Sequence, residues 1–147
     1  LHTMAHAVNP NSKAGNLVFE TARELSVPVM IHTGSGLPWA APAMSRPVAK
    51  SYPSVKVVLA HSGLIVFASE ALSVAMDCPN VWLETSWTGP HHIKNFVRTL
   101  GADRVMFGSD HWDNVCVELF KHRSLGLSDR ELELVLGGTA QQVYRLG

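Results

Sequence analysis

Residues 101–110 read GADRVMFGSD, which is a turn followed by a short apolar run and a polar tip. Val105, Met106 and Phe107 are consecutive and apolar, as is typical of a strand buried on both faces in a parallel sheet covered by helices. Gly108 ends the run, so we expect the Asp110 carboxylate near the carboxyl end of this strand. In parallel α/β folds the reacting groups gather at that end. Taken alone, Asp110 is better explained as the cap of the next helix.

The same pattern occurs four times along the chain, because a helix precedes a buried apolar run about every 25 residues. The predicted strands are Val27–Ile31, Val55–Ala60, Val81–Glu84 and Arg104–Phe107. Their polar tips are His32, His61, the run from Glu84 to Ser86, and Asp110. Strand–helix units of this size build parallel sheets with right-handed crossovers, so the predicted fold class is α/β.

The length of the chain limits which α/β folds are possible. The 147 residues suffice for one domain with its own core. They fit a flavodoxin-like open sheet, whereas a complete (β/α)8 barrel needs roughly 250 residues. The four predicted strands amount to about half a barrel, and Leu1-His2-Thr3 would suit the end of a preceding strand.

A half barrel has two open sheet edges and an inner face without an opposing layer. Each large side chain left exposed there forfeits roughly 1.5–3 kcal/mol, and a whole domain is stable by only about 5–15 kcal/mol. We therefore expect either a homo-oligomer or association with the remainder of a longer chain. The inner-face side chains expected to lose burial are Val29, Ile31, Val57 or Val58, and Val105 or Met106.

Composition excludes several classes of protein. Hydrophobic residues make up 46% and charged residues 16%, so the chain is globular rather than disordered. The formal net charge is zero, and no basic stripe indicates a nucleic acid or an anionic membrane as partner. The segment 25–45 carries no charge, but its prolines indicate a loop-bounded strand instead of a membrane span. Two cysteines outside any CxxC pattern favour a reduced, cytoplasmic protein.

The last quarter of the chain is patterned more weakly. Ser128 to Glu131 resembles a capping box for a helix that runs to about Leu136. We expect Gly137-Gly138 to break this helix and Thr139 to cap a final short helix.

Three chemically useful side chains follow predicted strands directly. His32, His61 and Asp110 would face one rim if their strands are parallel and adjacent. Imidazole nitrogens and a carboxylate suit a borderline divalent metal such as zinc, which acidifies a bound water. A second histidine could move protons. Each residue alone is more often ordinary loop structure than a ligand, but three equivalent positions of one repeat favour a site.

Aromatic residues cluster near the same tips. Trp39, Trp87 and Trp112 all follow predicted strands, and His111 adjoins Asp110. We expect Trp39, Trp87 and His111 to contact a small-molecule substrate, although packing over the sheet explains the tryptophans equally well.

Several segments occur together in an order that resembles a known family. They are VPVMIHTG (27–34), VVLAHSG (57–63), NVWLETS (80–86), residues 101–110 and LGGTA (136–140). The chain resembles the C-terminal half of the amidohydrolase-related family, in the branch of aminocarboxymuconate semialdehyde decarboxylase and related TIM-barrel hydrolases and decarboxylases. The resemblance implies one partial barrel domain over residues 1–147, with barrel strands from about four or five to eight.

The resemblance also implies roles for three residues. His32 would bind the metal, His61 would assist proton transfer, and Asp110 would bind the metal and orient the water. Zinc is the usual metal of such proteins, and their substrates are small carboxylated or cyclic compounds.

One family motif is missing from this chain, namely the His-x-His pair of the first barrel strand. Three interpretations stay open. The chain belongs to a metal-dependent hydrolase or decarboxylase whose site an N-terminal half completes; it is a non-catalytic half barrel that serves in assembly; or it is a metal-independent lactone hydrolase that uses His61 and Asp110.

Overall fold

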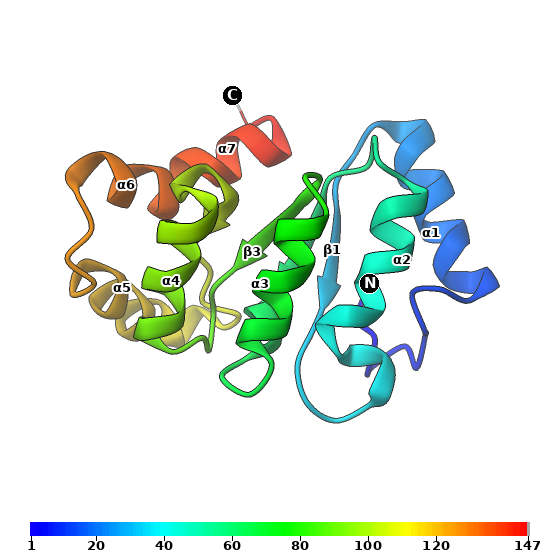
Figure 1. The fold of residues 1–147 in the computed structure, drawn as a ribbon, viewed down its shortest axis with the longest axis horizontal. Helices are drawn as coiled ribbons and strands as arrows, with labels where there is room; N and C mark the ends of the chain where they lie inside the picture. Colours follow the sequence, from blue (N-terminus) through cyan, green and yellow to red (C-terminus); the bar gives the residue numbers. More distant parts are fainter. Residues whose placement is uncertain (147) are drawn as a thin grey trace.

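A four-stranded parallel sheet forms the centre of the protein in the computed structural model, which describes residues 1–146. The strands lie in chain order, and Val29 pairs with Val57, which in turn pairs with Val81. In Figure 1 the arrow of β1 points towards the lower end of the molecule, where the strands finish. The strands are β1 (Val29–His32), β2 (Val57–Ala60), β3 (Val81–Glu84) and β4 (Val105–Met106).

Helices connect the strands, and two of these helices begin at side-chain caps. The Ser12 side chain accepts a hydrogen bond from Gly15 N at the start of the first helix, and Ser128 and Glu131 form the expected capping box. The α-helices are α1 (Lys13–Leu25), α2 (Ser45–Ser51), α3 (Ala68–Asp77), α4 (Pro90–Leu100), α5 (Val115–Arg123), α6 (Asp129–Glu133) and α7 (Thr139–Tyr144). Shorter turns are the 3-10 helices η1 (Pro38–Ala40), η2 (Pro42–Met44), η3 (His61–Gly63), η4 (Ala102–Arg104) and η5 (Trp112–Asn114), and the π-helix η6 (Leu134–Gly138).

The main core lies between one face of the sheet and the helices. Figure 1 shows α2, α3 and α4 over this face. Side chains of alternate strand positions, such as Ile31, Leu59 and Leu83, are fully buried there against Phe19 of α1 and Phe96 of α4. Because the period of a strand is two residues, the intervening positions point to the opposite face.

That opposite face is better covered than the sequence predicted. Val58 and Met106 pack against Val143 of α7 and are almost fully buried. Met30, at 39% exposed, is the strand residue there that keeps substantial contact with solvent. The prediction that the inner-face side chains lose burial is therefore wrong. Helix α7 covers Val58 and Met106. The other side chains of that prediction pack in the core between the sheet and the helices, namely Val29, Ile31, Val57 and Val105.

The strand order excludes the flavodoxin-like alternative. A doubly wound sheet reverses its strand order near the middle, whereas this sheet runs β1-β2-β3-β4. Leu1 continues the pattern beyond β1, since Leu1 N donates to Met30 O at 2.6 Å and His32 N donates to Leu1 O at 3.0 Å. These are the alternating bonds of a parallel ladder. The architecture is therefore half of a (β/α)8 barrel.

The expected break at Gly137-Gly138 is wrong, because α6, η6 and α7 follow one another without interruption. Thr139 has helical dihedral angles and its hydroxyl donates to Ala102 O at 2.9 Å instead of capping a helix. Phe107 N also donates to Val135 O at 2.8 Å. These bonds to η4 and to the chain after β4 hold the helix across both glycines.

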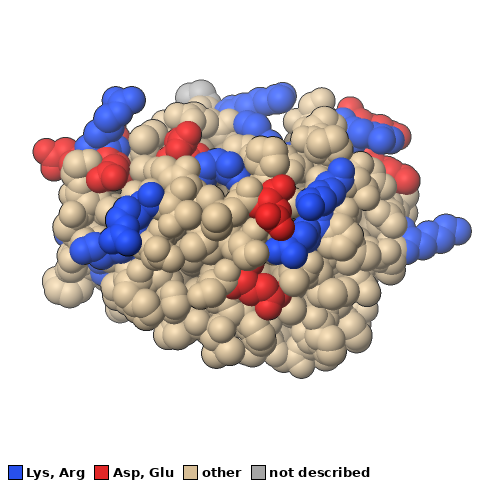
Figure 2. Space-filling model, in the orientation of Figure 1, with Lys and Arg blue, Asp and Glu red and all other residues tan. Residues whose placement is uncertain are grey.

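Surface charge is mixed on the face shown in Figure 2, where Lys and Arg lie among Asp and Glu. The lower end of that view, towards which β1 points, is mostly free of both. Within residues 1–146, every helix falls short of the length and hydropathy that a membrane crossing requires.

Candidate functional site

The carboxyl ends of the strands border a cavity of about 460 Å³. His32 ends β1, His61 follows β2, and Asp110 lies four residues beyond β4, and all three line this cavity. The structure thus brings the predicted trio to one rim. Below the rim the cavity wall is apolar and includes Met30 and Met106. Such a cavity offers polar groups at one end and an apolar surface at the other, as is usual for small-molecule sites.

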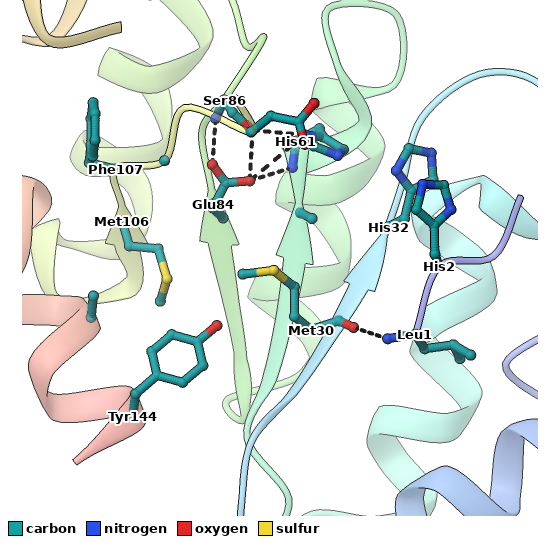
Figure 3. Close-up of a pocket in the computed structure, with 14 residues that line it drawn as sticks. Leu1, His2, Met30, His32, His61, Glu84, Ser86, Met106, Phe107 and Tyr144 are labelled. Carbon is teal, nitrogen blue, oxygen red and sulfur yellow. Dashed lines mark hydrogen bonds and ion pairs between the residues drawn. The ribbon is translucent and has the colours of Figure 1, made fainter. Parts of the chain in front are cut away.

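His32 is the most unusual side chain of the rim. Both of its ring nitrogens are shielded from solvent and lack a hydrogen-bond partner among the described residues. Its ring stacks on that of His2 at 4.2 Å between centroids and meets the edge of His61 at 4.9 Å (Figure 3). Burial, followed by the nearby His2 and His61, lowers the pKa of His32 to about 4, against a smaller opposing effect of Asp110. His32 is therefore a neutral imidazole at neutral pH, the form that binds metals.

His61 is held from both sides by the tip of β3. Its main-chain N donates to Glu84 Oε2 at 2.8 Å, and its ring Nδ1 lies 2.7 Å from Ser86 Oγ. Figure 3 shows these three residues joined in a closed network at the rim. Gly108 makes room for Glu84, because a Cβ at this position would overlap the Glu84 carboxylate. The sequence motif at the end of residues 101–110 thus shapes the site as well as the strand.

Asp110 is positioned by its neighbours in space. Trp87 Nε1 donates to Asp110 Oδ2 at 3.0 Å, and His111 Nε2 lies 3.6 Å from the same oxygen. The backbone at His61, Trp87 and Asp110 adopts left-handed conformations, with φ of 64°, 61° and 62°. Non-glycine residues avoid this region unless the surrounding structure imposes it, and such residues concentrate at functional sites.

Helix α5 fixes the loop that carries Ser86 and Trp87. Glu118 accepts a hydrogen bond from Trp87 N at 3.1 Å and forms an ion pair with Lys121. Lys121 Nζ donates to the main-chain oxygen of Thr85 at 3.4 Å, and His122 Nε2 lies 2.8 Å from the Thr85 hydroxyl. Glu118 and His122 are both buried, and burial lowers the pKa of His122. The sequence did not identify this group, because the periodicity of α5 is weak.

The structure places the predicted substrate contacts away from the cavity wall. Trp39 Nε1 donates to Thr3 O at 3.1 Å, so its ring supports the segment before α1. Trp87 contacts the site by its hydrogen bond to Asp110. The His111 side chain is 67% exposed. Trp112 is 88% exposed. The roles of Trp39, Trp87 and His111 in substrate binding stay predictions.

Two side chains of the site were given no role from the sequence. Leu1-His2-Thr3 was expected to end a preceding strand, but the sequence did not indicate that His2 lines the cavity and stacks on His32. Tyr144 of α7 also lines the cavity, and its hydroxyl is buried without a hydrogen-bond partner in the described structure. Its position depends on α7 covering the sheet, which the expected break at the glycines obscured.

The donor set fits a divalent metal in part. His32 offers a neutral imidazole whose nitrogens have no hydrogen-bond partner in the described part of the chain, and Asp110 offers a carboxylate at the same rim. No group of three or more His, Cys, Asp or Glu side chains in residues 1–146 is placed to hold a metal ion. Two ligands are fewer than the three protein ligands usual at a catalytic zinc, so further ligands are required.

Comparison with known proteins gives a family match. The sequence profile of the amidohydrolase family matches residues 1–146. Among curated protein sequences, none matches this chain.

Solved structures share the fold at low sequence identity. An uncharacterized TIM-barrel protein from Bordetella bronchiseptica is 19% identical with a TM-score of 0.78, over 92% of this chain and 52% of that protein. A dihydroxybenzoic acid decarboxylase from Polaromonas sp., with bound manganese and the inhibitor 2-nitroresorcinol, is 16% identical with a TM-score of 0.72, over 95% and 56%. An amidohydrolase from Burkholderia multivorans with bound zinc is 19% identical with a TM-score of 0.66, over 93% and 59%. This chain spans about half the length of these proteins.

Proposed function

Because the chain belongs to the amidohydrolase family, we propose that it carries half of the active site of a metal-dependent hydrolase or decarboxylase. Its substrate would be a small carboxylated or cyclic compound. The observation that carries this proposal is His32, an imidazole at the rim whose two nitrogens are buried without a hydrogen-bond partner in residues 1–146. A buried polar atom without a hydrogen bond costs about 1–3 kcal/mol, so a bound group that engages His32 would relieve that cost.

We assign a different role to each kind of side chain among His32, His61 and Asp110. His32 and Asp110 would hold the metal, together with ligands from outside residues 1–146. A divalent metal at this place supplies an acidified water or polarises a substrate oxygen. His61 would move protons between the reacting centre and the protein. Neighbours in the fold bind manganese or zinc, which supports a divalent metal without selecting zinc.

The cavity and one structural neighbour support a proposal for the substrate class. Its polar rim suits a carboxylate or a ring oxygen, and its apolar wall of Met30, Met106 and Phe107 suits a flat ring. One structural neighbour is a dihydroxybenzoic acid decarboxylase. We therefore propose hydroxylated aromatic acids as the first candidates and cyclic esters as the second.

The test is a product assay on the protein that contains this chain. Carbon dioxide release from hydroxylated benzoic acids and hydrolysis of lactones are measured before chelation, after chelation, and after return of zinc or manganese. The proposal predicts turnover that is lost on chelation and restored by metal. His32→Ala should abolish it, whereas His91→Ala, on the exposed start of α4, should not.

One observation favours a second candidate. Because His61 and Asp110 line the same cavity, a metal-independent lactone hydrolase that uses this pair is the alternative. Full lactone hydrolysis after chelation would establish it in place of the first. Absence of turnover with every substrate and metal would instead favour a half barrel that serves in assembly.

A further inference from the structure

The Ser86 hydroxyl bridges the ring of His61 and the carboxylate of Glu84. Ser86 Oγ lies 2.7 Å from His61 Nδ1 and donates to Glu84 Oε2 at 2.9 Å. The direct distance from His61 Nδ1 to Glu84 Oε2 is 3.8 Å, which is too long for a hydrogen bond. All three side chains are nearly inaccessible to solvent. The hydroxyl is therefore the only protein group of the described structure that connects the ring to the carboxylate.

The direction of these bonds determines the tautomer of His61. Glu84 accepts main-chain N–H bonds on both oxygens, from Ser86 at 2.7 Å and from His61 at 2.8 Å. An ionised carboxylate only accepts, so the single Ser86 proton points to Glu84. The Ser86 oxygen must then accept from His61, and Nδ1 must carry the ring proton. In neutral His61 this leaves Nε2 with a lone pair.

The position of the ring is fixed as tightly as its tautomer. His61 and Ser62 both have left-handed backbones, with φ of 64° and 45°. The Glu84 carboxylate holds the first through its N–H, and the Ser62 hydroxyl donates to Glu84 O at 2.7 Å. Strained conformations persist where surrounding contacts over-determine them. The Nε2 atom has no hydrogen-bond partner in residues 1–146, and His61 lines the cavity.

From this geometry we propose that Ser86 and Glu84 are positioning residues that keep His61 in the Nδ1–H form, with Nε2 as the proton acceptor of the cavity. When Nε2 takes a proton from substrate or water, the ring becomes an imidazolium. The Ser86 oxygen and the nearby carboxylate stabilise that charge, and the proton leaves again from Nε2. The inference rests on the proposed function for the identity of the reaction, but the tautomer is a property of the protein itself.

The decisive measurement is nitrogen-15 NMR of the histidine side chains in the full protein, at a pH where His61 is neutral. The His61→Gln variant assigns the signals. We expect the proton of His61 on Nδ1 in the wild-type protein. A wild-type His61 with its proton on Nε2 would overturn the proposal, whether or not the protein has measurable turnover.

Variants separate positioning from a structural role. Ser86→Ala should lose the exclusive Nδ1–H form and lower kcat on the order of 10²-fold with little change in KM, because general acid–base catalysis contributes about 10²–10⁴-fold. Ser86→Thr keeps the hydroxyl and should restore both. Thr139→Val is the matched control, since it removes another buried hydroxyl bond, to Ala102 O, and neither of these residues lines the cavity. An Ser86→Ala protein with wild-type tautomer and kcat would overturn the proposal.

The two proposals fail in different ways. If the protein proves inactive, or active without metal, the proposed function fails while the NMR result still decides the role of Ser86. Glu84→Gln is less suitable as a first variant, because Glu84 also accepts two main-chain bonds and its loss threatens folding. Melting temperatures of Ser86→Ala and Thr139→Val show whether both variants keep their fold.

Discussion

Arg104 of η4 connects the end of α3 to the start of β3, and Arg104→Met should lower the free energy of unfolding by about 2–3 kcal/mol. Its guanidinium donates to the carbonyls of Ala75 and Cys78 at 3.0 Å and of Val81 at 2.9 Å. The first two carbonyls lie at the end of α3 and the third starts β3. Burial lowers the pKa of Arg104, but a guanidinium stays charged in proteins.

The magnitude follows from these bonds. A hydrogen bond to a charged group contributes a net ~1.5–3 kcal/mol, so three bonds at the lower value give about 4.5 kcal/mol. Arg104 is partly exposed, and water will solvate some of the released carbonyls, which reduces the loss to about 2–3 kcal/mol. Methionine keeps most of the apolar stem, so its packing should remain close to that of the arginine.

Urea denaturation measures this loss. With a slope of about 1–3 kcal/mol/M, the midpoint should fall by roughly 1–2 M. Arg46→Met is the matched control, because Arg46 forms a partly exposed ion pair with Asp77, and surface pairs contribute about 0–1 kcal/mol. Equal losses in the two variants would refute the reasoning that Arg104 ties α3 to the sheet.

Three further predictions concern the rim, the pH dependence and the assembly. Asp110→Asn should abolish turnover and lower the metal content of the protein; near-normal turnover with unchanged metal would return Asp110 to a purely structural role. Burial lowers the pKa of His122, so the unfolded chain takes up a proton near its ordinary pKa of about 6.5 while the folded protein resists it. Stability should therefore fall as the pH drops below about 6.5, by at most ~1.4 kcal/mol per pH unit, and urea denaturation of His122→Gln at pH 7.5 and 5.5 should show a smaller loss than the wild type. Light scattering on residues 1–147 should detect dimers or larger species, because Leu17 and Leu25 of α1 are 62% and 66% exposed beside β1; a folded, active monomer would contradict this.

The strands were predictable because each buried strand is a run of consecutive apolar residues in the sequence. Val81–Glu84 has the predicted bounds. β2 begins two residues later than predicted, β4 lacks one predicted residue at each end, and β1 begins two residues later and ends one residue later than predicted. Once adjacent parallel strands are expected, the residues that follow them must meet at one rim. This is why His32, His61 and Asp110 could be placed together from the sequence.

The remaining features depend on contacts between distant segments. Gly137-Gly138 breaks helices by local propensity, but bonds from Val135 and Thr139 to the region around β4 override that propensity here. The stacking of His2 on His32 and the bridge from Ser86 to His61 likewise join residues separated by 25 or more positions. No local pattern encodes such pairs, so the geometry of the site required the structure.

The measurement that tests the central proposal most directly is elemental analysis of the purified protein. The wild type should contain stoichiometric divalent metal, His32→Ala should lose most of it, and His91→Ala should retain it. His32 is a neutral imidazole without a hydrogen-bond partner among residues 1–146, and we propose that it binds the metal at the rim. Wild-type metal content in the His32→Ala protein, or a metal-free wild type with full turnover, would contradict it.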